Sequence, residues 1–383
     1  MQTPESPRLK VLICIPWFSP AFRAGGPIRS IENLVSRKSN REYFIFCGHE
    51  DVSGQPLDVE TGKWLLYNEF TKVYYADKNN RSDKLVNASN TIKPDVIFIN
   101  GIYSWHFTIV PLYFCKAPKK IISVRGMLHK GALGQKMLKK QAYLFLWKLM
   151  SAQHKAFFHA TSTEEVEMIN SFFDDDVKVL LAKNYPAKID PLPQAGKEPG
   201  ALKIVSVALI SPMKNHLLVL QSLLNCTHKI EYHIIGSVKD ENYWNRCKEV
   251  IVRLPVNVTV RYDGELPHSQ VLNVLKDAHV FVLASESENF GHAIAEALSA
   301  GRPVITSKYT PWNDLELSKA GFNVELNTVD ISKVIDKFAE MGDGELGEWS
   351  RGAAEYFSRE IKLEEIDKQY ENLFEINGGE FKV

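Results

Sequence analysis

Residues 284–315 read ASESENFGHAIAEALSAGRPVITSKYTPWNDL, and this stretch decides the fold. It follows a short apolar run, Val280–Leu283, whose β-branched and aromatic residues predict a buried parallel strand. After a polar turn, a helix is predicted from about Gly291 to the residue before Gly301, and Pro303–Thr306 predicts a second strand. This order of elements places the turn at the carboxyl end of a parallel sheet, where open α/β folds bind ligands.

Two glutamates flank the start of this helix: Glu288 lies just before it and Glu296 lies inside it. The first helical turn offers backbone N–H groups and the positive end of the helix dipole to a phosphate or diphosphate. Gly291 has no Cβ, so an anion can approach its backbone closely. Because a carboxylate would repel a diphosphate and only accepts hydrogen bonds, Glu288 is expected to bind sugar hydroxyls. Each glutamate alone could equally be a solvated surface acid. The candidate donor-binding residues here are Asn289, Phe290, Gly291, His292 and Glu296.

The pattern of these residues resembles a known signature. Glu288-x7-Glu296, followed by Ala-Leu-x-x-Gly-x-Pro-Val-Ile, is similar to the donor site of retaining, nucleotide-sugar-dependent family 4 glycosyltransferases of the GT-B fold. Residues 310–312, Thr-Pro-Trp, resemble a bacterial branch of that family that builds surface polysaccharides. The resemblance implies an α/β protein with two Rossmann-like domains facing each other across a cleft, and a C-terminal helix that crosses back to the first domain. It also implies that Glu296 binds the ribose hydroxyls of the donor.

The length and composition of the chain fit this expectation. A chain of 383 residues, 45% apolar and 24% charged, can form two soluble domains with full cores. No apolar run approaches the ~18 residues of a membrane span, and the N-terminal stretch lacks the apolar region of a signal peptide. We therefore expect a cytoplasmic protein that could lie at the inner face of the cytoplasmic membrane. The 5 cysteines are odd in number and widely spaced, which predicts buried free thiols rather than disulfides or a zinc site.

Basic residues concentrate in the first part of the chain, although the net charge is zero. Residues 1–155 hold about 23 lysines and arginines against about 11 acids, and residues 96–163 contain no Asp or Glu. Acidic lipid headgroups, a lipid diphosphate or a charged glycan would complement this charge, unless it is only a solvated basic face. Residues 134–152 predict an amphipathic helix that either lies on an anionic membrane or packs on the sheet.

The first domain is predicted to span residues 1–190. Gly25 and Gly26 separate its first strand from its first helix and would let the backbone approach a ligand, although a tight turn would also use them. Arg125 follows a strand directly, where it could contact the donor diphosphate or the acceptor, or be a plain surface charge. Asn100 stands where family members often carry a histidine, so His106 is expected to be structural. Its predicted strands are Leu9–Pro16, Tyr43–Cys47, Val73–Ala76, Asp95–Ile99, Lys120–Val124, Ala156–Ala160 and Val177–Ala182.

A linker at residues 191–200 leads to a predicted donor-binding domain at 201–355, and a helix at 356–383 packs back on the first domain. Lys214 lies at a strand-to-helix turn and suits a phosphate as a point charge. In the family this lysine acts with an arginine five residues earlier, where this chain has Leu209. The resemblance places the nucleotide base near Gly264 and Leu266. Asp174–Asp176 lies in turn context, so no metal site is expected there.

The sequence thus predicts a metal-independent transferase with Glu288, Lys214 and Arg125 as catalytic residues. It would move a sugar from a nucleotide diphosphate sugar to a glycan or lipid-linked acceptor, with retention of configuration. No cofactor other than this co-substrate and no nucleic-acid partner are expected. Two alternatives stay open, a nucleotide-sugar epimerase of the GT-B fold and a non-catalytic nucleotide-sugar-binding protein, and Leu209 favours the second.

Overall fold

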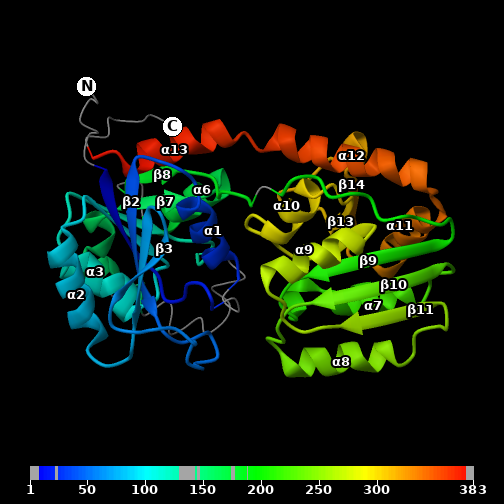
Figure 1. Cartoon of the computed structure of the whole chain (residues 1–383), viewed down its shortest axis with the longest axis horizontal. Coiled ribbons are helices and arrows are strands. Elements are labelled where there is room, and N and C mark those ends of the chain that lie inside the picture. Colours follow the sequence, from blue (N-terminus) through cyan, green and yellow to red (C-terminus); the bar gives the residue numbers. More distant parts are fainter. Residues whose placement is uncertain are drawn as a thin grey trace. The chain divides into compact units, whose positions relative to one another are not determined.

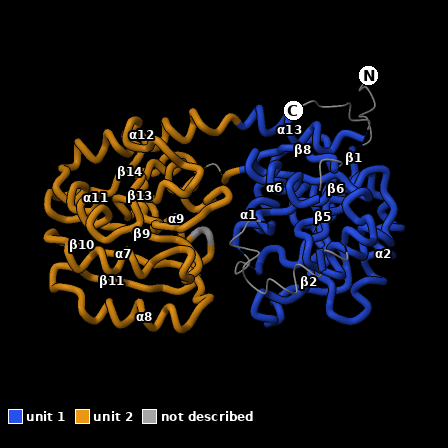
Figure 2. Tube along the Cα trace, turned by 180° about the vertical axis from the view of Figure 1, so that it is seen from behind, with its two compact units in different colours: residues 1–185, 363–383 blue, residues 186–362 orange. Residues whose placement is uncertain are grey.

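The computed structural model describes residues 8–21, 25–128, 143–144, 147–173, 177–187 and 189–376. The chain divides into two compact units, shown in separate colours in Figure 2. Unit 1 comprises residues 1–185 and 363–383, and unit 2 comprises residues 186–362. Each unit contains its own sheet with helices packed against it (Figure 1).

Unit 1 is built on an eight-stranded sheet of order β3-β4-β2-β1-β5-β6-β7-β8. Every strand pair is parallel except β3 with β4. All five residues of β5 are buried, as expected for a continuous apolar run between two covered faces. The strands are β1 (Leu9–Cys14), β2 (Arg41–Gly48), β3 (Trp64–Asn68), β4 (Thr71–Ala76), β5 (Val96–Asn100), β6 (Lys119–Ser123), β7 (Phe157–Ala160) and β8 (Val179–Leu181).

The helices of unit 1 include one from the far end of the chain. Helix α13 brings Phe374 against Phe98 of β5, with ring centroids 5.4 Å apart, and stacks Tyr370 on Tyr185 at 4.7 Å. The described helices are α1 (Gly26–Val35), α2 (Arg81–Ile92), α3 (Val110–Tyr113), α6 (Thr163–Phe173) and α13 (Leu363–Phe374), with a π-helical turn at Trp105–Ile109 and a 3-10 turn at Ala152–Lys155.

Unit 2 is built on a six-stranded, fully parallel sheet of order β11-β10-β9-β12-β13-β14. Alternate residues of β12 enter different cores: Val280 and Val282 join one, and Phe281 and Leu283 join the other. Both faces of the sheet are therefore covered, which explains the uninterrupted apolar run. The strands are β9 (Ala201–Val207), β10 (Lys229–Ile235), β11 (Val258–Tyr262), β12 (Val280–Leu283), β13 (Val304–Ser307) and β14 (Gly321–Val324). The helices are α7 (His216–Leu223), α8 (Glu241–Ile251), α9 (His268–Asp277), α10 (His292–Ser299), α11 (Thr328–Glu340) and α12 (Asp343–Glu360).

The strand order reverses beside the first strand of each sheet. In unit 1, β1 lies between β2 and β5, and in unit 2, β9 lies between β10 and β12. At such a reversal the loops at the carboxyl ends of neighbouring strands diverge to opposite faces and leave a crevice that binds ligands. The residues that follow β9 and β12 are therefore the first place to look for a site in unit 2.

The unit boundaries differ from those expected from the sequence. Residues 191–200, predicted as a linker, belong to unit 2. The Leu192 N–H donates to the Ala300 carbonyl at 3.1 Å, and Lys197 Nζ donates to the carbonyls of Ala339 at 2.8 Å and Met341 at 2.9 Å. Pro- and Gly-rich sequence here marks an extended segment that packs along the domain, and unit 2 continues to residue 362 rather than 355.

The C-terminal helical region is also divided differently. The sequence predicts one helix at 356–383 that packs back on the first domain, but over the described residues the structure has α12 in unit 2 and α13 in unit 1. Ile361 ends α12 with an extended backbone, at φ −105° and ψ 96°. The apolar positions on either side of this break therefore belong to two different cores, which periodicity alone does not reveal.

Other sequence-based expectations have mixed outcomes. The five cysteines are all free and buried, as predicted. Residues 134–142 and 145–146 of the predicted amphipathic helix and the Asp174–Asp176 turn lie outside the described residues. Trp147, which lies within the predicted amphipathic helix, is buried in the core of unit 1. Within the described part of the chain, none of the helices combines the length and apolar character required to cross a membrane.

Candidate functional site

The loops that follow β9 and β12 are joined directly at the carboxyl edge of the unit 2 sheet. The Glu286 N–H donates to the Met213 carbonyl at 2.9 Å, which ties the loop after β12 to the short 3-10 turn Pro212–Lys214. β9 and β12 are neighbours in the sheet, so their ends are fixed by the ladder between them. Two loops about 70 residues apart in sequence thus form one surface.

An ion pair joins two of the predicted catalytic residues on this surface. Lys214 Nζ lies 2.5 Å from Glu288 Oε1, and Ser285 Oγ donates to the same oxygen at 2.7 Å. The Lys214 and Glu288 side chains are 21% and 10% exposed, so both remain accessible to a ligand. Ser285 is fully buried, and its carbonyl accepts a 2.5 Å hydrogen bond from Ser307 Oγ of β13. The sequence analysis did not single out Ser285, because its role depends on contacts between strands.

The turn into α10 has the geometry expected of an anion site. Gly291 is the N-cap, with φ 73° and ψ 58°, a left-handed conformation that favours glycine. A Cβ at this position would lie 3.2 Å from Ile294 and 3.3 Å from Trp312. As a glycine, the N-cap residue provides no side-chain capping hydrogen bond, and the first turn of the helix carries no acid. Together with the helix dipole, this leaves a positive end suited to phosphate.

Trp312 holds this turn in place through contacts with Phe290. Its Nε1–H donates to the Phe290 carbonyl at 2.6 Å, and its ring lies edge-on to Phe290 with centroids 5.6 Å apart. The Trp312 ring is also stacked with Phe357 of α12, with centroids 6.4 Å apart. The Thr-Pro-Trp motif therefore fixes the backbone that precedes Gly291, a role that the motif alone did not indicate.

The other predicted donor-binding residues lie on or beside the same turn. Asn289 is exposed, Phe290 and His292 are half-buried, and Glu296 is 5% exposed within α10. The rings of Phe290 and His292 lie 4.8 Å apart. The structure thus brings the predicted residues 288–296 together with Lys214 around one helix N-terminus.

The loop after β11 lies at the same edge, next to the loop after β10. The Gly264 carbonyl accepts from the Gly236 N–H at 2.7 Å, and the Gly236 carbonyl accepts from Tyr262 OH at 2.9 Å. Leu266 is partly buried against the core of unit 2. Gly236 was not predicted, although a Cβ there would meet the Ala208 carbonyl oxygen at 1.9 Å. A glycine directly after an apolar strand is the sequence signal that marks it.

The matches with known proteins agree with this geometry. Residues 190–346 match glycosyl transferases group 1. This glycosyl transferases group 1 region contains all six strands of unit 2 and the Lys214–Glu288 surface. None of the curated proteins shows significant sequence similarity to the chain.

Solved structures share the fold over almost the whole chain. Sucrose-phosphate synthase from Thermosynechococcus elongatus is 14% identical, with a TM-score of 0.69 over 96% of this chain and 98% of that one. Anabaena Alr3699/HepE in complex with UDP and glucose is 13% identical, with a TM-score of 0.69 over 96% and 99%. WaaG, a glycosyltransferase involved in lipopolysaccharide biosynthesis, is 12% identical, with a TM-score of 0.63 over 96% and 100%. These similarities show that the chain has the GT-B fold, as predicted.

In unit 1, the structure directs Arg125 into the domain. Its backbone is left-handed, with φ 54°, and the Gly126 N–H that follows donates to Glu165 Oε1 at 2.6 Å. The Arg125 guanidinium donates through Nε to Asn100 Oδ1 at 3.2 Å and through Nη1 to Asn184 Oδ1. Asn100 and Asn184 are each 3% exposed. Arg125 follows β6 closely, as predicted from the sequence. Its side chain, however, donates to two buried side-chain amides of unit 1.

The glycine pair of unit 1 lies at the start of α1. Gly25 is the N-cap with φ 70°, and no atom lies within 4 Å of its virtual Cβ, so conformation rather than crowding requires glycine. Gly26 is exposed and opens the helix, and Pro27 occupies the first turn. No acid lies in that turn. The conformation of Gly25 therefore agrees with a glycine turn, and a ligand-binding role for the pair stays a prediction.

Buried histidines are present in both units. Burial and the charge of Arg125 lower the pKa of His159 to about 3, and its ring contacts Ser123 Oγ at 2.9 Å and the Ala182 carbonyl at 2.8 Å. Burial and the charge of Lys214 lower the pKa of His216 to about 3. Both imidazoles are therefore neutral at pH 7. His106 lies 2.8 Å from Ser82 Oγ through Nδ1.

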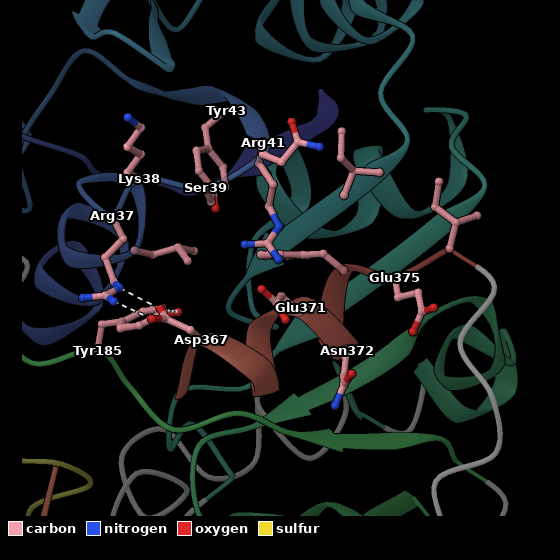
Figure 3. Close-up of a pocket in the computed structure, with 15 residues that line it drawn as sticks. Arg37, Lys38, Ser39, Arg41, Tyr43, Tyr185, Asp367, Glu371, Asn372 and Glu375 are labelled. Atoms are coloured by element: carbon pink, nitrogen blue, oxygen red, sulfur yellow. Dashed lines mark hydrogen bonds and ion pairs between the residues drawn. The ribbon is translucent and has the colours of Figure 1, made fainter. Parts of the chain in front are cut away.

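A cavity of about 670 Å³ opens in unit 1 where β1 and β2 begin, which is the sheet edge opposite Arg125 (Figure 3). Arg37 and Asp367 form a bidentate ion pair across it, with distances of 2.7 and 2.5 Å. Tyr185 OH donates to the same carboxylate at 2.7 Å. These contacts attach α13 to the C-terminal end of α1.

Proposed function

We propose that the protein is a retaining glycosyltransferase that uses a nucleotide diphosphate sugar and a glycan or lipid-linked acceptor in bacterial surface polysaccharide synthesis. The observation that carries the proposal is the Lys214–Glu288 ion pair, 2.5 Å long, beside the N-terminus of α10, where Gly291 is the N-cap. It combines a cation and a helix dipole for a diphosphate with a carboxylate for sugar hydroxyls. The match of residues 190–346 to glycosyl transferases group 1 supports this assignment.

In the proposed mechanism, positive charge stabilises the leaving diphosphate. Lys214 and the N–H groups at the start of α10 would face the phosphates. A diphosphate carries more negative charge than the Glu288 carboxylate, so Lys214 would contact it when the donor binds. The positive charge comes from the chain, so the proposal requires no bound metal. As the glycosidic bond breaks, negative charge grows on the diphosphate, and fixed donors stabilise that state more than the ground state.

Glu288 would orient the donor sugar. Ser285 and Lys214 both contact its Oε1 atom, which leaves Oε2 available to accept from a sugar hydroxyl. The ion pair fixes the carboxylate before the donor arrives, so less ordering is needed when it binds. Glu296, inside α10, would hold the ribose hydroxyls, and Gly264 and Leu266 would lie near the base. Asn289, Phe290, Gly291 and His292 would form the phosphate-facing turn.

Unit 1 would supply the acceptor side and the glycine loop. Gly25 and Gly26 would permit close approach of the donor phosphates or the acceptor to the N-terminus of α1. Arg125 takes a different role in the proposal from the one expected from sequence. Because its Nε and Nη1 atoms already bond Asn100 and Asn184, we assign it to positioning the edge of unit 1.

Leu209 removes one cation from the site. It is half-buried after β9, where the related transferases have an arginine. The loss of one charge-assisted contact would weaken binding of the transition state by roughly 1.5–3 kcal/mol. This favours one alternative, a nucleotide-sugar-binding protein that does not catalyse transfer.

The test is donor binding followed by nucleotide release. UDP-, GDP-, ADP- and dTDP-sugars are screened by thermal shift, beginning with UDP-glucose because Anabaena Alr3699/HepE has been solved with it. A donor at 100 times its Kd should stabilise the protein by about 2.7 kcal/mol. The shift should disappear in Glu296→Ala, and nucleotide should then be released in the presence of an acceptor.

Each other outcome assigns a different function. A thermal shift without nucleotide release, with any acceptor or water, indicates the non-catalytic binder. Turnover of the donor sugar without an acceptor indicates the epimerase. The absence of any shift with all four nucleotides contradicts the donor site itself.

A further inference from the structure

The cavity of unit 1 has the size and the setting of a small-molecule site (Figure 3). Its volume of about 670 Å³ lies within the roughly 300–1,000 Å³ that is usual for such sites. The starts of β1 and β2 and the C-terminal ends of α1 and α13 enclose it. Every residue that lines it belongs to unit 1, whereas the Lys214–Glu288 surface belongs to unit 2. The cavity is therefore separate from the candidate donor site.

Two hydroxyl groups in the lining have no hydrogen-bond partner among the described residues. One is the OH of Tyr43, a residue that is only 1% exposed, and the other is the buried Oγ of Ser39. A buried hydroxyl that forms no hydrogen bond destabilises the folded protein, so most such groups have a partner. A ligand with polar groups of its own would supply that partner inside the cavity.

Arg41 adds charged hydrogen-bond donors next to Tyr43. The two residues are two apart in β2, so their side chains leave the same face of the sheet, and Figure 3 shows both pointing toward α13. The Arg41 guanidinium lies 5.3 Å from the centre of the Phe374 ring, and this contact holds it in place. In the part of the chain that the structure describes, Arg37 pairs with Asp367, but no carboxylate lies within ion-pair distance of Arg41. The N–H groups of Arg41 are therefore available to a ligand.

The α13 side of the cavity offers acceptors instead. Glu371 and Glu375 line it and are exposed, and neither carboxylate forms an ion pair within the described ranges. The Asp367 carboxylate, in contrast, already accepts from Arg37 and Tyr185. A ligand between β2 and α13 would thus meet donors on one side and acceptors on the other.

The charge of the lining favours a neutral ligand. Its ionised side chains balance in number, with Arg37, Lys38 and Arg41 against Asp367, Glu371 and Glu375. Helices α1 and α13 both end at the cavity, and the C-terminal end of a helix carries partial negative charge. These dipoles and the acids of α13 together oppose an anion, although the arginines alone would attract one.

We propose that the cavity of unit 1 is a second carbohydrate site, which binds a neutral saccharide. Sugar hydroxyls both donate and accept, so one ring can accept from Arg41 and bond Tyr43 while it donates to Glu371. The C–H groups of the sugar would contact Leu9 and Leu34, which also line the cavity. This site goes beyond the proposed transfer reaction, because a free saccharide would bind here without a nucleotide donor.

The test is saturation-transfer NMR of the full chain with the methyl glycosides of glucose, galactose, mannose, N-acetylglucosamine and rhamnose. We expect at least one glycoside to receive magnetisation from the protein, and titration gives its Kd. Inorganic phosphate should not displace the bound glycoside, because the acids and helix ends around the cavity oppose an anion.

Two variants place the binding in this cavity. Tyr43→Phe should raise the Kd about fivefold without lowering stability, because the hydroxyl that it removes has no partner in the described chain. Arg41→Met should raise the Kd at least tenfold, because it removes charged donors. Tyr74→Phe in β4 and Arg246→Met in α8 make the same changes at positions that do not line the cavity, and both should bind as wild type does. Denaturant titration checks that all four variants are folded.

The proposal is overturned if none of the glycosides binds, or if Tyr43→Phe and Arg41→Met bind them as wild type does. Displacement of the glycoside by phosphate also overturns it and assigns the cavity to an anion. A protein that releases nucleotide from a donor but binds no free glycoside remains a transferase without this second site. Glycoside binding that depends on Tyr43, with no response to any nucleotide sugar, would support the second site and contradict the donor site.

Discussion

The carboxyl edges of the two parallel sheets differ in what their charged side chains contact. In unit 2, Lys214 and Glu288 bond to each other and remain 21% and 10% exposed. In unit 1, Arg125 occupies the corresponding kind of position, after a strand and before a glycine, but it bonds two amides that are each 3% exposed. Similar positions on similar sheets therefore carry either a pair that stays partly exposed, which we propose binds a ligand, or a side chain that holds the domain together. The partners of a side chain decide between these roles.

The largest expected effect comes from neutralising the ion pair of unit 2. Glu288→Gln and Lys214→Met should each lower donor turnover by about 100-fold or more, because each removes a charge placed for the transition state. Unfolding free energy should change by less than about 1 kcal/mol, since both side chains are partly exposed. Nucleotide release and thermal melting measure the two effects.

Nearby residues supply controls for these variants. Glu286→Gln and Lys239→Met make the same chemical changes at exposed positions on the same edge of the sheet. They should retain turnover within about threefold of wild type. Full activity in Glu288→Gln or Lys214→Met would remove the ion pair from the mechanism.

In unit 1, substitution of Arg125 is expected to lower stability, whereas the unit 2 substitutions are expected to lower turnover. Arg125→Met should lower the free energy of unfolding by about 2–3 kcal/mol, because buried oxygens of Asn100 and Asn184 lose a charged donor. Denaturant titration measures this loss, and Arg351→Met, at an exposed position on α12, is the control. Unchanged stability with lost turnover would instead support the phosphate contact that the sequence predicts.

The buried histidines predict that the free energy of unfolding depends on pH to the same extent in the two units. The pKa values of His159 and His216 are about 3 when folded, against about 6.5 when unfolded. The unfolded chain therefore binds more protons between these values, and stability falls as pH decreases through this range. From pH 7 to pH 5 each histidine should cost about 2 kcal/mol of unfolding free energy.

Denaturant titration at pH 7 and pH 5 tests this dependence. His159→Gln should reduce the pH dependence of unit 1, and His216→Gln should reduce that of unit 2. A pH dependence that persists undiminished in both variants would show that other groups cause it.

The smallest expected effect comes from the hydrogen bond that Trp312 donates to the turn before α10. Trp312→Phe keeps an aromatic ring but removes the 2.6 Å hydrogen bond to the Phe290 carbonyl. Donor affinity should fall about fivefold, the equivalent of about 1 kcal/mol. Calorimetric titration of the donor measures it. Trp349→Phe in α12, in the core on the other face of the sheet, should leave affinity unchanged.

The sequence predicted the parts of the fold that rest on local patterns. β12 spans Val280–Leu283 as expected, because a short β-branched run between polar segments has one plausible structure. β3 and β14 were not predicted. β3 is an edge strand with a mixed burial pattern, and β14 contains a glycine and an asparagine, which are uncommon in strands, so neither has a clear sequence signal.

The residues of the candidate site could be proposed from the sequence, but their contacts could not. Glu288, Gly291 and Lys214 could be named because a strand end, a glycine and a charged turn are local features. The hydrogen bond that Ser285 donates to Glu288 and the inward direction of Arg125 could not be named. Arg125 meets Asn184 across 59 residues of sequence, and only packing of the whole unit brings them together.

Unit 1 is made of two segments separated by the whole of unit 2, and this sets an order of assembly. During synthesis, residues 186–362 emerge before α13 exists, although Phe98, His159 and Tyr185 need α13 to cover them. Unit 2 is contiguous and can complete its core first. The first segment of unit 1, residues 1–185, therefore has an uncovered apolar face until α13 has been synthesised. Chaperone demand at this stage should depend on how soon α13 arrives.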